Sequence, residues 1–203
     1  MRRAALVLAL VALALPAGAT ANGDPASDVL LTSQVFLPFE APISSSAKAD
    51  LTKTVAASNS QGYKIRVAVI AFTGDLGTAV SLWKRPQDYA KFLWSEIAFV
   101  YSNRLLVVMP SGFGFYDGKK PIAKQLRVLS KVRPGTTPTP LAESATEAVR
   151  RLAAADGVTI AKSSGGGSNT RDRLILGAAV LAFLVVLLFP ARLLRRRSRP
   201  AEQ

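Results

Sequence analysis

The chain has 203 residues, a net charge of +13, and neither cysteine nor histidine. Without these two residue types it has no disulfide framework, no Ser-His or Cys-His catalysis and no imidazole metal site, so any metal would be a hard cation on oxygen ligands. Residues 22–170 hold only 17 Lys and Arg against 11 Asp and Glu, and the rest of the excess lies in the two termini, so we expect no nucleic-acid partner.

The first 21 residues have the pattern of a signal peptide. Two arginines precede an apolar run over residues 4–15, and Ala19 and Ala21 fit a small-x-small cleavage site. An uncleaved anchor is the alternative, although the apolar run is short for a membrane span. The pattern predicts export of a domain that covers residues 22–161.

The first part of that domain is predicted to contain a lead-in, an edge strand and a helix. The lead-in covers residues 22–42, and within it residues 35–37 form an edge strand or an extended arm because Pro38 confines a strand to an edge. Residues 44–60 form a helix, since apolar residues recur at every fourth position from Ala47.

The middle of the domain is predicted to be a parallel strand–helix–strand unit. Residues 64–72 are apolar on both faces, which is typical of a central strand covered on both sides. Residues 86–101 carry an apolar stripe at helical spacing, and residues 104–109 form a second buried strand. The length of this segment fits a right-handed crossover, and residues 113–116 add a short extended piece.

Residues 119–133 carry six cations and no acid, and they are predicted to form an amphipathic helix with one basic face. Two readings of this face stay open. It is either the solvated outer side of a docked helix, or a surface that contacts anionic lipid head groups or an acidic envelope polymer. The residues of this anionic-surface contact are Lys120, Lys124, Arg127 and Lys131.

The C-terminal part is predicted to hold a last helix and a membrane anchor. The helix runs from residue 139 to about residue 155, and residues 162–173 form a flexible linker. Residues 174–191 are 18 uncharged, mostly apolar positions, long enough for a transmembrane helix. An arginine-rich tail of residues 192–203 follows, so we expect a single-pass cell-membrane protein with a cytoplasmic tail and an extracytoplasmic domain.

These elements predict an α/β fold, a compact sandwich in which helices cover a mixed sheet, plus the one transmembrane helix. Residues 44–129 resemble the TPM domain family in their leading helix, the strand IRVAVIAF, the helix PQDYAKFLWSEIAFVYSN and the strand RLLVVMPSGFGFY. The layout of signal peptide, domain, linker and span is common in that family, some members of which are reported as acid phosphatases or cation binders. The chain departs from the family in the approach to the first helix and in the turn after the second strand, so the resemblance implies no acidic cluster here.

The ligand candidates are the polar residues that follow predicted strands, because α/β sheets bind ligands at these loops. They are Asp75, Ser111 and Asp117, although the simpler reading of both aspartates is that they are turn residues that cap local backbone. No catalytic set, metal ligand or cofactor is predicted from them. The first hypothesis is therefore a binding or scaffolding module for a protein partner or an anionic polymer, and the alternative is a phosphatase-like hydrolase that uses a divalent cation.

Overall fold

The computed structural model of the chain describes residues 23–40, 42–118 and 120–161. The predicted signal peptide, linker, transmembrane helix and tail lie outside these residues. Within the described ranges, no helix is both long enough and apolar enough to cross a membrane.

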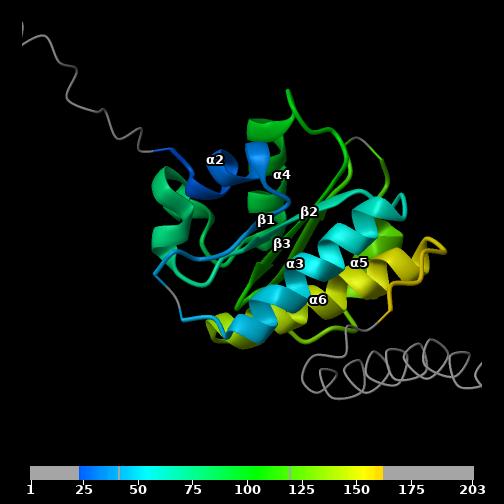
Figure 1. The fold of residues 1–203 in the computed structure, drawn as a ribbon. Helices are drawn as coiled ribbons and strands as arrows, with labels where there is room; N and C mark the ends of the chain where they lie inside the picture. Colours follow the sequence, from blue (N-terminus) through cyan, green and yellow to red (C-terminus); the bar gives the residue numbers. More distant parts are fainter. Residues whose placement is uncertain (1–22, 41, 119, 162–203) are drawn as a thin grey trace, which may run out of the picture. The chain divides into compact units, whose positions relative to one another are not determined.

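A mixed four-stranded sheet forms the centre of the fold, as predicted (Figure 1). Its strands are β1 (Val35–Phe36), β2 (Ile65–Val69), β3 (Arg104–Met109) and β4 (Gly112–Tyr116), and they lie in that order across the sheet. β1, β2 and β3 are parallel, and β4 returns antiparallel to β3. The prediction that residues 35–37 hold an edge strand and that β2 is central is therefore confirmed.

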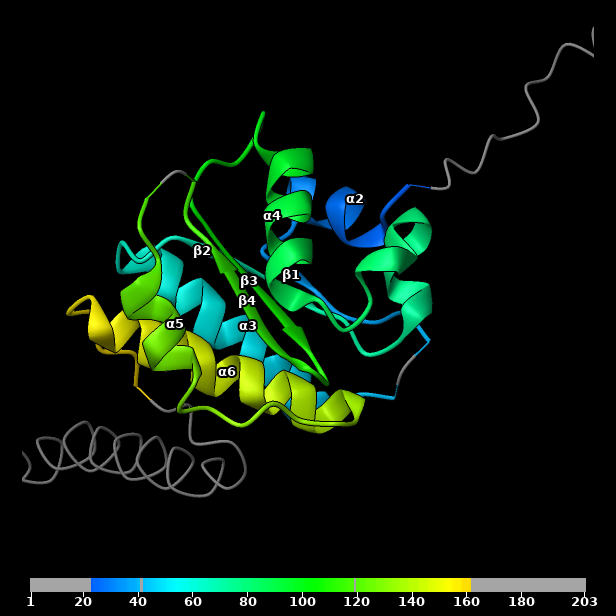
Figure 2. The same ribbon diagram turned by 180° about the vertical axis from the view of Figure 1, so that it is seen from behind.

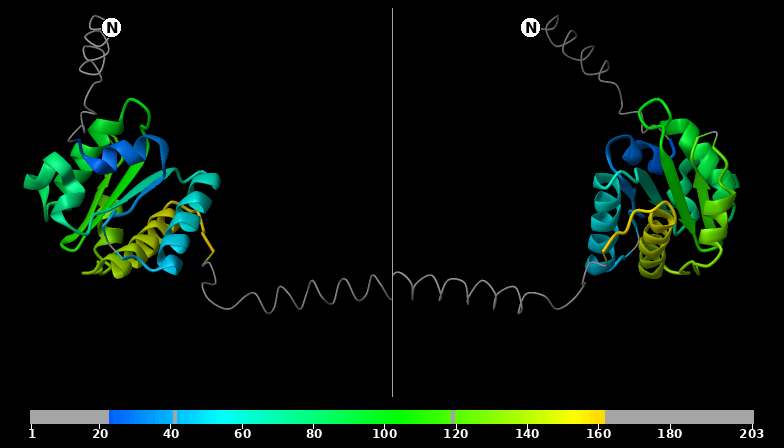
Figure 3. Two further views of the ribbon diagram at one scale, coloured as in Figure 1. Left: turned by 60° about the vertical axis from the view of Figure 1, so that its left-hand side comes forward. Right: turned by 90° about the vertical axis from the view of Figure 1, so that its right-hand side faces the viewer.

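Helices cover both faces of the sheet, which makes three layers (Figures 1 and 2). One face carries α3 (Ser45–Ser60), α5 (Ala123–Leu129) and α6 (Pro138–Ala155), with α3 and α6 side by side (Figure 3). The other face carries α2 (Pro25–Thr32), the 3-10 segment η1 (Thr73–Leu82) and α4 (Pro86–Ile97).

The sheet separates two hydrophobic cores, because its central strands are apolar on both sides. From β2, Ile65, Val67 and Val69 pack toward α3 and α6, whereas Ala68 and the following Ile70 pack toward α2 and α4. This explains why residues 64–72 read as apolar throughout rather than as an alternating pattern.

The two parallel crossovers have opposite hands. The chain passes from β1 to β2 through α3 on one face, and from β2 to β3 through η1 and α4 on the other. Since both steps move in the same direction across the sheet, one of them departs from the usual right-handed connection. β1 lies between α2 on one face and α3 on the other.

Three predicted elements differ from the structure. The lead-in contains the helix α2, which begins after the N-cap Asp24 with Pro25 in its first turn. α4 ends at Ile97 instead of residue 101, which leaves Phe99 exposed.

The basic helix is much shorter than predicted. It covers seven residues instead of fifteen, so Lys120 and Lys131 lie outside it. Pro121 explains the late start, because a residue before proline avoids the helical conformation. The four predicted contact residues therefore do not share one helix face.

Candidate functional site

Asp75 lies at the carboxyl end of β2 and is only 8% exposed. Its carboxylate oxygen Oδ2 accepts hydrogen bonds from the backbone N–H groups of Ala71 (2.8 Å) and Phe72 (2.9 Å). Burial raises the pKa of Asp75, and the two hydrogen bonds oppose that rise. Asp75 is thus a local backbone cap, which is the structural role considered for it from the sequence.

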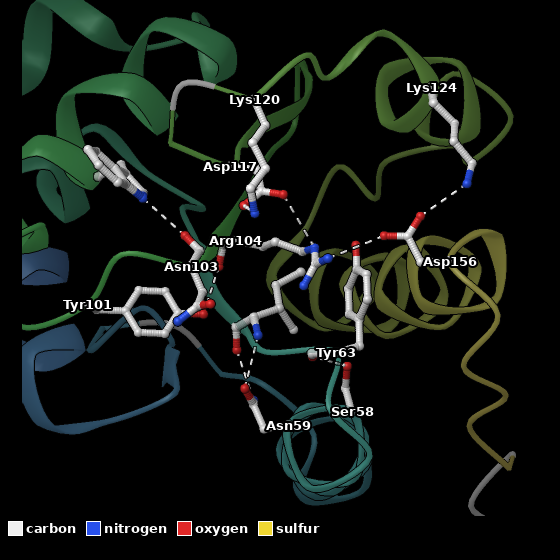
Figure 4. A network of polar contacts seen from close by, with 12 residues as sticks. Ser58, Asn59, Tyr63, Tyr101, Asn103, Arg104, Asp117, Lys120, Lys124 and Asp156 are labelled. Atoms are coloured by element: carbon white, nitrogen blue, oxygen red, sulfur yellow. Dashed lines mark hydrogen bonds and ion pairs between the residues drawn. The ribbon is translucent and has the colours of Figure 1, made fainter.

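Asp117 lies at the opposite end of the sheet, because β4 runs antiparallel to β3. It is 6% exposed and forms ion pairs with Arg104 (Nε to Oδ2, 3.5 Å) and Lys120 (Nζ to Oδ1, 3.5 Å) (Figure 4). Arg104 also reaches Asp156 at 3.4 Å, and its guanidinium lies over the ring of Tyr63 at 4.2 Å. Asp117 therefore belongs to an ion-pair network, and among the described residues its carboxylate accepts no hydrogen bond from local backbone.

The third candidate, Ser111, is exposed in the turn between β3 and β4. It shares the carboxyl end of the parallel strands with Asp75, while Asp117 is at the other end. The structure does not bring the three together. In the described part of the chain, no group of three or more Asp, Glu, His or Cys residues is arranged to hold a metal ion.

The four predicted surface cations fall into two pairs. Lys120 is bound to Asp117, and Lys124 is bound to Asp156 at 3.1 Å (Figure 4). Arg127 and Lys131 are exposed and have no ion-pair partner among the described residues. The contact of these four residues with an anionic surface stays a prediction.

One buried acid was not among the predicted candidates. Asp24 is 4% exposed, and its Oδ1 accepts a 2.6 Å hydrogen bond from the Tyr89 hydroxyl of α4 and a 3.2 Å bond from the N–H of Ala26. Its Oδ2 has no hydrogen-bond partner among the described residues. Burial raises the pKa of Asp24 from 3.8 to about 6, although both hydrogen bonds act in the opposite direction. The Asp-Pro pair at the start of α2 was the sequence signal for this cap.

The outer edge of β1 exposes unpaired backbone groups. The N–H of Val67 in β2 donates to the carbonyl oxygen of Gln34 at 2.9 Å, and Val35 stands opposite Val67 in the register. Since successive residues of a strand bond to opposite sides, the N–H and C=O of Val35 point away from the sheet. No other described residue forms a hydrogen bond with these two groups.

A groove of about 520 Å³ runs along this edge. One wall comes from α2, with Val29 and Ser33, and the other from α3, with Lys48 and Thr52. Phe39, which follows β1, lines the groove as well and is 72% exposed. We call this the β1 groove.

The other edge of the sheet is closed by a side chain. The N–H of Phe115 in β4 donates to Oε1 of Gln87 at 3.1 Å, and Nε2 of Gln87 donates to the carbonyl oxygen of Phe115 at 2.9 Å. The amide of Gln87 thus replaces the hydrogen bonds of a neighbouring strand. A Cβ atom on Gly114 would lie 1.9 Å from the carbonyl oxygen of Pro86, so α4 begins directly against β4.

An open edge inside a groove is the geometry used for strand addition, in which an extended peptide pairs with the edge of a sheet. The backbone supplies affinity, and the groove walls supply contacts for alternate side chains.

The comparisons with known proteins find similarity among solved structures and none among family models or curated sequences. No family model matches the sequence, and no curated protein matches it. The solution NMR structure of the N-terminal domain of the cg2496 protein from Corynebacterium glutamicum is similar, with 13% sequence identity, a TM-score of 0.41, and coverage of 67% of this chain and 85% of that chain. A similarity at this level carries no conclusion about function, and membership of the TPM domain family remains a prediction.

Proposed function

We propose that this protein is a membrane-anchored binding module whose extracytoplasmic domain pairs the outer edge of β1 with an extended segment of a partner protein. The observation that carries the proposal is the outward N–H and C=O of Val35, which have no hydrogen-bond partner among the described residues. An exposed edge of this kind is a template for another strand, and proteins usually cover it. Here the side chain of Gln87 covers the opposite edge, whereas no described residue bonds to the outward backbone groups of this one.

The energetic argument favours a modest affinity. Each backbone hydrogen bond contributes about 1 kcal/mol net, and β1 with its flanks offers only a few. The exposed ring of Phe39 adds apolar surface, at roughly 25 cal/mol for each Å² removed from water. We expect a dissociation constant of about 10 to 100 µM for a short peptide, which suits a domain held at a surface where the effective concentration of its partner is high.

Membrane attachment is the second part of the proposal, and its support comes from the sequence. The uncharged stretch of residues 174–191 is followed at once by an arginine-rich tail, and residues 1–21 have the pattern of a signal peptide. We do not extend the proposal to a cation-dependent phosphatase, because Asp75 and Asp117 lie at opposite ends of the sheet.

The test uses the full-length protein in detergent micelles and, as the probe, an acetylated and amidated heptapeptide of alternating threonine and valine. We expect the probe to shift the backbone amide signals of Val35 and Leu37 in an NMR titration, with little change in β4. Probes carrying one N-methyl group at each position in turn should lose binding at alternate positions only, because only every second N–H of an added strand faces β1.

Two variants of one residue make the matched pair. Val35→Pro removes the outward N–H without removing a bond to β2 and should weaken binding at least tenfold. Val35→Ala keeps that N–H and should bind nearly as the wild type does. Equal binding by both variants, or loss at every N-methyl position alike, would show that the probe binds by side-chain contacts and not by strand addition.

A further inference from the structure

We infer that the β1 groove selects ligand strands in which one acidic residue is flanked on both sides by apolar residues. This inference rests on the proposed strand addition at β1 and gives the chemistry of the partner segment. It follows from the directions in which the side chains of β1 point, together with the residues that form the two walls.

The side chains of β1 alternate between the two faces of the sheet. Val35 packs against the core beneath α3, whereas Phe36 packs into the core beneath α2. In a paired strand, residues that stand opposite each other point to the same face. A ligand residue opposite Val35 therefore points toward α3, and its two neighbours point toward α2.

The α3 wall is polar and positively charged. Lys48 and Thr52 are four positions apart, so they lie one turn from each other on the same side of α3, and both are exposed. The Thr52 hydroxyl donates to the Lys48 carbonyl oxygen at 2.9 Å. The ammonium group of Lys48 has no ion-pair partner within the described residues. A carboxylate on the ligand residue opposite Val35 would complement it.

The α2 wall is apolar apart from Ser33, which directly follows the last residue of α2. It presents Val29, and the half of the groove on this side continues to Phe36 and Phe39, whose rings meet edge to face at 5.6 Å. Phe36 is fully buried, so its packing holds the exposed ring of Phe39 in place. The two ligand residues that flank the acid would remove this surface from water, as valine, isoleucine or leucine side chains can.

The experiment compares three heptapeptides that differ only in the central residue, which is glutamate, threonine or lysine between two valines. Their binding to full-length protein in micelles is measured by fluorescence anisotropy at about 50 mM salt and again at about 500 mM salt. We expect the glutamate peptide to bind about threefold more tightly than the threonine peptide and the lysine peptide to bind more weakly than both, at low salt only.

The charge-reversed variant Lys48→Glu should invert this order. Lys53→Glu, five positions further along α3 and not among the residues that line the groove, should leave it unchanged. If all three peptides bind equally to both proteins, the inference is wrong and strand addition stands. If none of the three peptides binds, the proposed strand addition at β1 is wrong, and the inference about an acidic residue falls with it.

A second copy of the protein is the other possible occupant of the groove. Edge-to-edge pairing of two β1 strands would appear as a dimer in sedimentation velocity that the glutamate peptide dissociates. That result would overturn the assignment to a foreign acidic segment, whereas a monomer that binds the glutamate peptide would support it.

Discussion

The two edge strands of the sheet, β4 and β1, differ in how the outward-facing N–H and C=O groups of their backbones are satisfied. At β4, the side chain of Gln87 forms two hydrogen bonds with Phe115 and closes the edge. At β1, the backbone groups of Val35 face a groove and have no such partner among the described residues. Unpaired edges promote association, so a protein that protects one edge and leaves the other open gains a single directed site for pairing.

The difference also shows what closes an edge. Both outer strands lie next to a helix, α4 for β4 and α2 for β1, and α4 approaches β4 at backbone distance where Pro86 meets Gly114. Gly114 makes that approach possible because it has no side chain between β4 and Pro86. At β4 the close approach of α4 brings the side chain of Gln87 to the backbone groups of Phe115, and this side chain closes the edge.

The largest effect is expected from Gly114→Ala. The added methyl group would lie 1.9 Å from the Pro86 carbonyl oxygen, so α4 must move away from β4. We expect a loss of about 3 kcal/mol or more in the free energy of unfolding, measured by urea denaturation. Gly74→Ala is the control, because a Cβ atom there meets nothing within 4 Å. Equal stability of the two variants would show that the closed edge does not depend on this approach.

The next effect concerns α2, the helix beside the open edge. The pKa of Asp24 is raised from 3.8 to about 6 in the folded protein, so the native state binds more protons than the unfolded chain between these pH values. The free energy of unfolding should therefore fall as pH rises from 4 to 6, by on the order of 2 kcal/mol, and then level off.

Asp24→Asn removes this titration while keeping an N-cap and an acceptor for the Tyr89 hydroxyl. It should match the wild type in stability at pH 4 and exceed it at pH 7, by on the order of 2 kcal/mol. Urea denaturation at the two pH values measures both. A wild-type stability that rises between pH 4 and pH 6, with the same rise in the variant, would contradict this account of Asp24.

The smallest effect is expected at the closed edge itself. Gln87→Ala leaves the N–H and C=O of Phe115 without partners, which should cost about 1 kcal/mol and let β4 pair with other chains. Sedimentation velocity and urea denaturation measure the two consequences. Gln87→Glu keeps an acceptor for the N–H but no donor for the carbonyl oxygen, so its effect should be intermediate. A Gln87→Ala variant that stays monomeric would show that the side chain of Gln87 is not what keeps the β4 edge from pairing with other chains.

Much of the fold followed from the sequence because its strands and long helices carry strong periodic patterns. The central strand, the parallel unit around α4 and the helices α3 and α6 were predicted within a few residues. α2 was missed because eight residues with mixed polarity give a weak pattern, although Asp24 and Pro25 marked its start. The basic helix was predicted too long because four cations recur at helical spacing over residues 120–131, whereas α5 covers only Ala123–Leu129.

The candidate site was harder to predict than the fold, because it depends on which backbone N–H and C=O groups lack a hydrogen-bond partner in the folded protein. Asp75 and Asp117 were chosen because they follow strands, yet one caps local backbone and the other joins an ion-pair network. The β1 groove is formed by residues that are ordinary in sequence, such as Val35 and Lys48. Their place in a binding site depends on the hydrogen-bond partners of the backbone, which are set by the tertiary structure and not by the local sequence.

The short length of β1 has a consequence for hydrogen exchange. The amide of Val67 in β2 is held by the carbonyl oxygen of Gln34, so opening of the segment that contains β1 frees this amide without unfolding the central sheet. A ligand that pairs with Val35 stabilises the closed segment by mass action. Exchange at Val67 should then slow when a ligand strand binds on the far side of β1, and this one amide would report occupancy of a site that it does not touch.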